Sequence, residues 1–269
     1  MIIDFHTHIF PENIAEKTLE MMEKNSGIKA TGKNTLTGLC TSMKNGQIDY
    51  SVVLPVATKP TQFDSINQFA TDINHTDGII SFGGIHPDND NIPEKLAYIK
   101  SLGLKGIKLH PDFQGPTYID DARYIEIIKE CIRLDLICVI HAGMDVGIPI
   151  PIHCPPDRAY LMLKEVLKEC DKDSKIILAH IGGHMQWELV EELLVGQNVY
   201  FDLAYSIKRI AKDTLLRIIK NHGSDRILFA TDFPWSNQKE SAEFVKALPL
   251  SENEIENIMY RNAARLLEL

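Results

Sequence analysis

The segment Leu136-Ile-Cys-Val-Ile-His141 is a short apolar run that ends in a histidine. Its length and its β-branched side chains predict a strand, and the lack of polar alternation predicts that both of its faces are buried. Apolar residues at helical spacing lie on either side of it along the chain: Ile125, Ile128 and Ile132 before it, and Leu163, Val166, Leu167 and Cys170 after it. A buried strand between two amphipathic helices is typical of a parallel sheet that is covered by helices.

The same alternation of strand and helix recurs eight times along the chain. The strand-like runs are residues 2–5, 50–56, 79–85, 105–110, 136–141, 175–180, 199–203 and 226–231. Eight such units in about 250 residues is the size of a (β/α)8 barrel. An open doubly wound sheet is the competing fold, but it would require a Gly-x-Gly-x-x-Gly motif after an early strand, and the sequence contains none. We therefore predict an α/β protein with a (β/α)8 TIM barrel of the metal-dependent hydrolase type. It should form a single domain over residues 1–269, with a long excursion at about 11–47 after the first strand.

The composition is that of an ordinary globular enzyme. The 269 residues are 44% hydrophobic and 24% charged, with a formal net charge of -9. This charge predicts neither a nucleic-acid partner nor a membrane surface, and no apolar run approaches the roughly 18 residues of a membrane span. The five cysteines are odd in number and show no Cys-x-x-Cys spacing, which favours reduced thiols in the cytoplasm. A homodimer is the default expectation for such a protein.

Metal-binding side chains stand where the predicted strands end. They are His6 and His8, Lys108 and His110, His141, His180, and Asp232. Active sites of (β/α)8 barrels lie at the carboxyl ends of the strands, which converge even though they are far apart in sequence. Histidine and aspartate are residue types that bind zinc and similar cations and that transfer protons.

The first strand carries the most informative spacing. Residues i and i+2 of a strand share a face, so the pair His6 and His8 can converge on one ion. Strict alternation also places Asp4 on this face, deeper in the barrel, where a structural or ligand-orienting role is natural. At the end of another strand, Asp202 either orients a ligand or caps the following turn.

Several of these segments together resemble the amidohydrolase superfamily, in its amidohydrolase-related branch that includes aminocarboxymuconate-semialdehyde decarboxylase. The segments that carry the resemblance are Asp4-Phe-His-Thr-His8, Gly106-Ile-Lys-Leu-His-Pro111, His141-Ala-Gly143, Ala179-His-Ile-Gly-Gly183, Ala230-Thr-Asp-Phe-Pro-Trp235 and Arg261-Asn-Ala-Ala-Arg-Leu266. The resemblance spans essentially the whole chain, and the combination is specific although each fragment alone is not.

This resemblance implies a set of site residues. The metal ligands would be His6, His8, His141 and Asp232, and the catalytic groups would be Asp232 and His180, the latter beside a metal-bound water. Lys108 matches a lysine that is carboxylated in some branches and bridges two metals there, so Lys108 and His110 are candidates for a second metal or for the substrate. The decarboxylase-like branch implies a single ion, and we expect one divalent metal, zinc in the first instance.

Such a site supports two reactions on a small molecule. A metal lowers the pKa of its bound water to about 7, so that hydroxide can attack an amide, ester or lactone carbonyl. The alternative is non-oxidative decarboxylation of a small unsaturated or aromatic acid. A carboxy-lyase needs a cation to hold the substrate carboxylate, and only Arg158 or Lys59 is suggested by its position in the sequence. Neither is convincing, so we expect a hydrolase first, a carboxy-lyase second, and a catalytically silent metal-binding barrel third.

Overall fold

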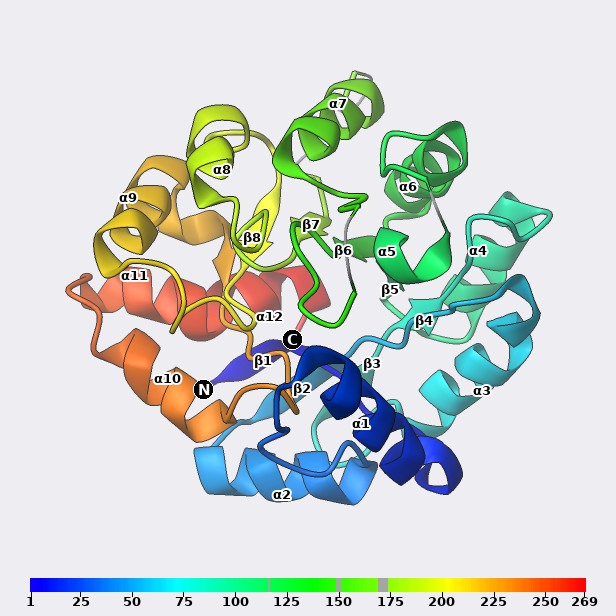
Figure 1. The fold of residues 1–269 in the computed structure, drawn as a ribbon, viewed down its shortest axis with the longest axis horizontal. Helices are drawn as coiled ribbons and strands as arrows, with labels where there is room; N and C mark the ends of the chain where they lie inside the picture. The colour runs from blue at the N-terminus through cyan, green and yellow to red at the C-terminus, as the bar shows by residue number, and fades with distance from the viewer. Residues whose placement is uncertain (116, 149–150, 169–173) are drawn as a thin grey trace.

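Parallel strands form a closed ring that is surrounded by helices (Figure 1). The structure is a computed structural model that describes residues 1–115, 117–148, 151–168 and 174–269. The strands are β1 (Ile3–Thr7), β2 (Tyr50–Val53), β3 (Ile79–Ser81), β4 (Gly83–Gly84), β5 (Gly106–Leu109), β6 (Ile137–Ile140), β7 (Ile176–Leu178), β8 (Tyr200–Asp202) and β9 (Ile227–Leu228). The strands pair in the order β1-β2-β3 and β4-β5-β6-β7-β8-β9. Only Phe82 separates β3 from β4, so these two segments together form one strand of the barrel.

Contacts between the last strand segment and the first close the ring. The backbone N–H of Phe5 donates to the carbonyl of Phe229 at 2.9 Å, and Thr7 forms a parallel bridge with Phe233. The β/α barrel that the alternating pattern predicts is thereby confirmed.

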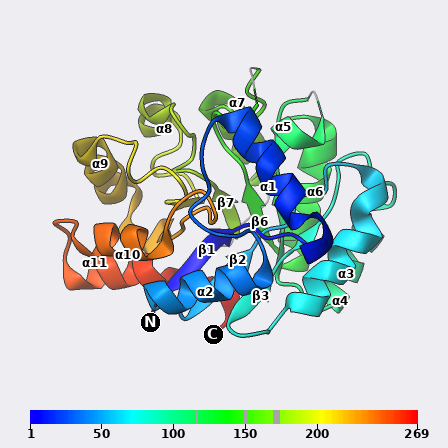
Figure 2. The ribbon, with the colours of Figure 1, turned by 60° about the horizontal axis from the view of Figure 1, so that its bottom comes forward.

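Helices cover the outside of the ring, and the N- and C-termini of the chain lie at the same end of the barrel (Figure 2). They are α1 (Glu12–Ser26), α2 (Leu36–Gly46), α3 (Phe63–Ile73), α4 (Ile92–Ser101), α5 (Pro111–Gln114), α6 (Ala122–Leu134), α7 (Pro156–Val166), α8 (Trp187–Leu193), α9 (Lys212–His222), α10 (Gln238–Lys246), α11 (Glu252–Glu256) and α12 (Asn262–Leu267). Shorter turns are η1 (Pro60–Gln62), η2 (Ser224–Arg226) and the π-helical η3 (Asn257–Arg261). Among the described residues, no helix combines the length and the apolar character that a membrane crossing requires.

The buried apolar side chains form two layers. The inner layer fills the barrel with Phe5, Leu54, Phe82, Val139 and Ile177, and Leu267 of α12 joins it. The outer layer lies between the strands and the surrounding helices. Because a filled barrel leaves no pore, the chemistry is confined to the carboxyl ends of the strands.

The first strand departs from strict alternation. Asp4 pairs with Ser51 and Thr7 pairs with Val53, so β1 advances three residues where β2 advances two. This irregularity, of the kind a β-bulge produces, lets both Phe5 and His6 face the barrel interior.

The placement of Asp4 on the histidine face is therefore wrong. Its carboxylate accepts hydrogen bonds from Thr231 Oγ1 at 2.5 Å and from Gln238 Nε2 of α10 at 2.7 Å, on the helix side of the sheet. The inference failed because a sequence pattern does not reveal where a strand inserts an extra residue. Asp4 nevertheless has a structural role, since it ties β1 to the loop that carries Asp232.

The excursion after β1 contains α1 and α2. In both ribbon views α1 lies over the end of the barrel near β2 and β3 (Figures 1 and 2). The segment between the two helices is bound to the loop after β9, because the N–H and the hydroxyl of Thr31 both donate to the carbonyl of Pro234, at 2.7 and 2.9 Å. We propose that residues 1–269 form one domain, in which this excursion is part of the wall of the site.

The cysteines in the described residues, Cys40, Cys131, Cys138 and Cys154, are free thiols. Cys170, which the helical pattern placed on a helix face, lies outside the described residues.

Candidate metal centre

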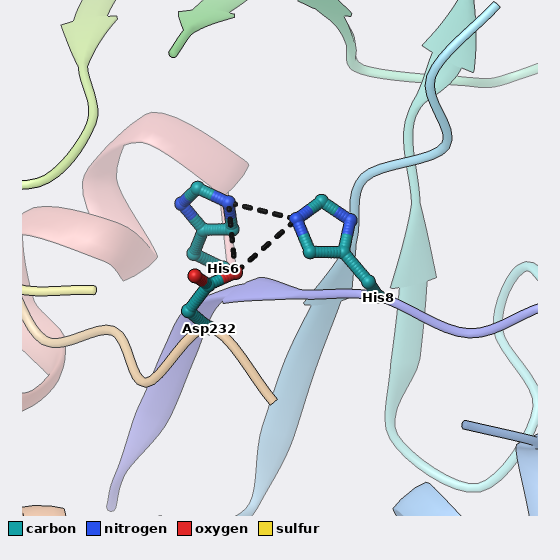
Figure 3. A group of neighbouring side chains, drawn as sticks. All are labelled: His6, His8 and Asp232. Atoms are coloured by element: carbon teal, nitrogen blue, oxygen red, sulfur yellow. Dashed lines mark hydrogen bonds and ion pairs between the residues drawn. The ribbon is translucent and has the colours of Figure 1, made fainter. Parts of the chain in front are cut away.

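Three donor atoms converge at the carboxyl end of β1 (Figure 3). His6 Nε2 lies 3.1 Å from His8 Nε2, and Asp232 Oδ1 lies 3.6 Å from the former and 3.3 Å from the latter. Ligands with bonds of about 2.1 Å in a tetrahedral arrangement are about 3.4 Å apart. The three atoms therefore have the spacing of three ligands around one divalent metal ion.

Hydrogen bonds orient both histidines for this role. His6 Nδ1 lies 2.8 Å from Asp202 Oδ2, and His8 Nδ1 lies 2.8 Å from the carbonyl oxygen of Leu54. Because both partners are acceptors, each Nδ1 carries the hydrogen and each Nε2 presents a lone pair. Two lone pairs that face each other at 3.1 Å repel unless a cation lies between them. The histidine pair is thus held in the tautomer and orientation that a metal requires.

Asp202 fulfils both roles that its position at a strand end suggested. Its Oδ2 fixes His6, while its Oδ1 accepts the backbone N–H of His180 at 2.8 Å and that of Ala204 at 3.1 Å. The side chain is fully buried, and burial raises the pKa of its carboxyl group. The buried carboxylate thus connects His6 of β1 to the backbone after β7 and β8.

We expect Asp202→Asn to weaken binding of the metal about 10- to 100-fold without unfolding the protein, as loss of a group that orients a ligand does elsewhere. The amide keeps the shape of the side chain but removes the charge that holds His6 Nδ1–H. Competition with a chelator measures the Kd. The exposed Asp90→Asn variant is the control, and an unchanged Kd in Asp202→Asn would show that Asp202 does not orient His6.

Lys108 of β5 reaches the same centre from across the barrel. Its side chain is fully buried, and its Nζ lies 3.3 Å from His6 Nε2. Burial lowers the pKa of Lys108 to about 8, while the carboxylates of Asp202 and Asp232 act in the opposite direction. A buried ammonium group therefore adjoins the three converging donors.

His180 and His141 form a pair beside the three donors. His180 Nδ1 donates to the carbonyl of Ala204 at 3.0 Å, and its Nε2 lies 2.9 Å from His141 Nδ1. Burial lowers the pKa of His180 to about 4, so its ring is neutral at pH 7. The rings of His6 and His180 are 5.2 Å apart between centroids, which places His180 next to the metal centre.

The structure does not bring every predicted residue together. His141 lies outside the group of His6, His8 and Asp232, since its Nδ1 faces His180 and its Nε2 faces Asp112. The ring of His110 stacks on that of His141 at 3.9 Å. The assignment of His141 as a fourth ligand of the first ion stays a prediction.

Two carboxylates near these rings escaped the sequence analysis. Asp112 follows the strand end at His110, and Asp145 lies in the loop after β6. The segment His110-Pro-Asp112 held a usable signal, because any acidic residue that directly follows such a strand end is near the site. Asp145 is in an irregular loop and had no such signal.

The two cations that the sequence suggested for a substrate carboxylate are elsewhere. Arg158 pairs with Asp120 at 3.0 Å and lies over the ring of Tyr118. Lys59 is exposed at the start of η1. The cation at the site is Lys108.

A closed β/α barrel with histidine and aspartate donors at its strand ends defines the class of metal-dependent barrel enzymes. The profile of the amidohydrolase family matches residues 3–269. The chain therefore belongs to the amidohydrolase family, and the resemblance read from the sequence is confirmed. A comparison with curated protein sequences gives no match.

Solved structures share the fold over nearly their full length. A 2,6-dihydroxybenzoate decarboxylase in complex with 2,6-dihydroxybenzoate is 16% identical, with a TM-score of 0.72 over 100% of this chain and 99% of that one. The 5-carboxyvanillate decarboxylase of Sphingomonas paucimobilis is 12% identical, with a TM-score of 0.72 over 100% and 99%. A dihydroxybenzoic acid decarboxylase of Polaromonas sp. JS666, with bound manganese and the inhibitor 2-nitroresorcinol, is 16% identical, with a TM-score of 0.73 over 100% and 97%.

These neighbours overturn the order of the two predicted reactions. Hydrolysis was expected first, but the solved barrels named above are decarboxylases, so that prediction is wrong and the alternative is favoured. The physical reason for the error is Lys108, because its position at the metal centre was not evident and the missing cation had counted against a carboxy-lyase. The expectation of a divalent metal is supported by the manganese in a neighbour and by the three converging donors.

Proposed function

We propose that the protein is a metal-dependent, non-oxidative decarboxylase of a small aromatic or unsaturated carboxylic acid. The observation that carries the proposal is the buried ammonium group of Lys108, 3.3 Å from a metal-ligand nitrogen of His6. A carboxylate that enters this site can be bound by Lys108 Nζ and held next to the metal. The neighbours that share the fold act on dihydroxybenzoates and 5-carboxyvanillate, which are acids of this class.

In this proposal the ion is held by His6, His8 and Asp232, and His141 remains the predicted fourth ligand. The ion supplies positive charge that binds the acid and stabilises negative charge that develops on it. Lys108 Nζ adds a second positive group in a site from which most water is excluded, where an electrostatic contact is stronger than in water. Together these groups fix the orientation of the acid before the carbon–carbon bond breaks.

The reaction requires one proton at the carbon that loses carbon dioxide. The electron pair of the broken bond stays on that carbon, which takes up the proton, and carbon dioxide leaves. We assign this transfer to His180. Because its Nδ1–H is held by the carbonyl of Ala204, Nε2 of the neutral ring first takes up a proton from solvent and then passes it to the carbon, which returns the ring to its neutral form. Asp232 remains a charged ligand, since its close contacts with His6 and His8 hold the pKa of its carboxyl group below the usual range.

The identity and number of ions belong to this proposal as well. Zinc remains our prediction for the ion at His6, His8 and Asp232, and the manganese in a neighbour makes Mn²⁺ the ion to compare with it. Lys108 acts here as an unmodified ammonium group. A carboxylated Lys108 would be an anion and would not hold a substrate carboxylate.

The experiment is an assay of carbon dioxide release. Protein loaded with Zn²⁺ or Mn²⁺ is incubated with a panel of hydroxybenzoates and unsaturated acids, and matched esters, amides and lactones are the controls. We expect decarboxylation of at least one acid, loss of this activity after chelation, and its recovery when metal is restored. Metal-dependent cleavage of an ester, amide or lactone, without turnover of any acid, would refute the proposal.

We also propose the binding partner, the oligomeric state and the compartment of the protein. The partner that the site accommodates is a small molecule. We propose a homodimer in the cytoplasm, which size-exclusion chromatography with light scattering and fractionation of cells will test.

A further inference from the structure

The metal centre is closed off from solvent. The side chains of His6 and Asp232 are 1% and 12% exposed, and Lys108, to which we assign the substrate carboxylate, is fully buried. A small molecule cannot contact groups that are covered to this extent. A segment that covers the centre must therefore move before the substrate enters.

The helix α1 lies over this end of the barrel (Figures 1 and 2). It begins shortly after His8, and at its C-terminal end Ser26 adjoins Gly147 in the loop after β6. A Cβ atom built on Gly147 would lie 3.8 Å from the Cβ of Ser26. The N–H of Gly147 donates to Asp145, whose other carboxylate oxygen lies 3.2 Å from His110 Nε2. The helix therefore spans the mouth of the site, from the end of β1 to the loop after β6.

The N-terminal end of α1 is anchored through Asn34. The side-chain amide of Asn34 donates to the carbonyl of Ala15 at 3.1 Å, and its own carbonyl accepts the N–H of Phe10 at 2.8 Å. Of the residues of α1, all of which the structure describes, only Ala15 is buried. A second anchor follows the helix, where Thr31 is bound to the carbonyl of Pro234. Residues 16–30 lie between these two anchors.

These intervening residues are not attached to the rest of the protein. Across the described ranges of the chain, the hydrogen bonds and ion pairs of residues 16–30 all stay within α1 and the turn that follows it. Ser26 Oγ donates to the carbonyl of Met22 at 2.8 Å, and the carboxylate of Glu23 binds both the ammonium group of Lys29 and the N–H of Ala30. None of residues 16–30, which are all described, is buried. Polar contacts thus hold the segment only at its two ends.

We propose that residues 16–30 form a lid that opens about the anchors at Asn34 and Thr31 to admit the substrate, and that closes by bringing Ser26 against Gly147. Opening breaks no hydrogen bond or ion pair with the rest of the described chain and exposes no buried side chain, so its free-energy cost is low. Closing excludes water and so strengthens the electrostatic contact between Lys108 and the substrate. The lid controls access to the centre whichever reaction takes place there.

The contact between Ser26 and Gly147 allows the lid to be locked. The Cβ atoms of a disulfide are typically about 3.8 Å apart, which is the separation at these two positions. Ser26→Cys/Gly147→Cys is loaded with Zn²⁺, oxidised and mixed with excess chelator, and the release of zinc is followed in time. We expect oxidation to slow the release by about 10²-fold, because the disulfide stabilises the closed form. A phosphine reductant should restore the rate of the wild type.

The two single variants, Ser26→Cys and Gly147→Cys, are the controls for the substitutions and for oxidation of the native thiols. We expect both to release zinc at the rate of the wild type after the same treatment. The proposal is overturned by an oxidised double variant that carries the cross-link, as shown by mass spectrometry, and releases zinc as fast as its reduced form. It is also overturned by a cysteine pair that cannot be oxidised, because the closed lid requires the two positions to meet.

Hydrogen exchange of the wild type is a second readout, which needs neither a variant nor a bound metal. An isolated helix of 15 residues is only marginally stable in water, whereas α6 buries four side chains against its neighbours. We therefore expect the amides of residues 19–26 to exchange at least about 10²-fold faster than those in the middle of α6. Equal protection of the two helices would show that α1 is held as firmly as α6 and would refute the lid. Neither measurement requires turnover, so both remain valid if the protein is not a decarboxylase.

Discussion

Lys108→Met is expected to lower kcat/KM for decarboxylation about 10²- to 10³-fold while the protein remains as stable as the wild type or becomes more stable. The loss follows from removing one charged donor in a buried site, where such contacts contribute most. The gain follows from burial, because an ammonium group that is fully buried pays a desolvation penalty that a methionine of similar length does not. Carbon dioxide release measures the first effect, and the Tm of metal-free protein measures the second.

A matched substitution at an exposed position distinguishes the effect of losing a charge at the site from the effect of losing a charge elsewhere. Lys59→Met makes the same chemical change at an exposed position at the start of η1. We expect its kcat/KM to stay within about twofold of the wild type, since exposed charges contribute little. If Lys108→Met kept full activity, the substrate carboxylate would not be held by this residue, and the argument for a carboxy-lyase from Lys108 would fail.

His6→Ala/His8→Ala is expected to remove one equivalent of metal per chain and to lower decarboxylation by about 10³-fold or more, since a metal contributes several kcal/mol to such reactions. Only Asp232 of the three donors would remain, and a single carboxylate does not hold a transition metal tightly at micromolar concentrations. Elemental analysis measures the first result, and the carbon dioxide assay measures the second.

The control for this double variant removes another histidine. His75 is exposed, so His75→Ala should leave the metal content unchanged. A His6→Ala/His8→Ala protein with the full metal content of the wild type would refute the central assignment. Retained activity in the absence of that metal would refute the proposed role of the ion.

The barrel could be predicted because each strand carries its own signal. The run Leu136–His141 is apolar throughout and lies between two helical patterns, and similar runs recur along the chain. Burial on both faces is a property that a short segment reveals by itself. The register of β1 was not predictable in this way, since the extra residue between Asp4 and Thr7 depends on how β1 pairs with β2. The face assigned to Asp4 was wrong for that reason.

Part of the candidate site could also be predicted, because the strand ends can be located in the sequence. His6, His8 and Asp232 stand directly at strand ends, and the closure of a barrel brings such ends together. The sequence does not show where the long side chain of Lys108 extends within the barrel. Lys108 was a candidate ligand, yet only the structure shows its ammonium group beside His6, where it can serve as the cation that a carboxy-lyase needs.

The sequence by itself determined the barrel, the family and the set of residues that stand at the strand ends. Those properties depend on local hydrophobic pattern and on residue type, both of which are written along the chain. Only the tertiary structure decided which of these side chains lie together. His6, His8 and Asp232 converge, whereas His141 faces His180 through Nδ1 at 2.9 Å and Asp112 through Nε2 at 3.8 Å. A hydrogen bond between residues 39 positions apart is a property of the folded barrel, and no spacing in the sequence specifies it.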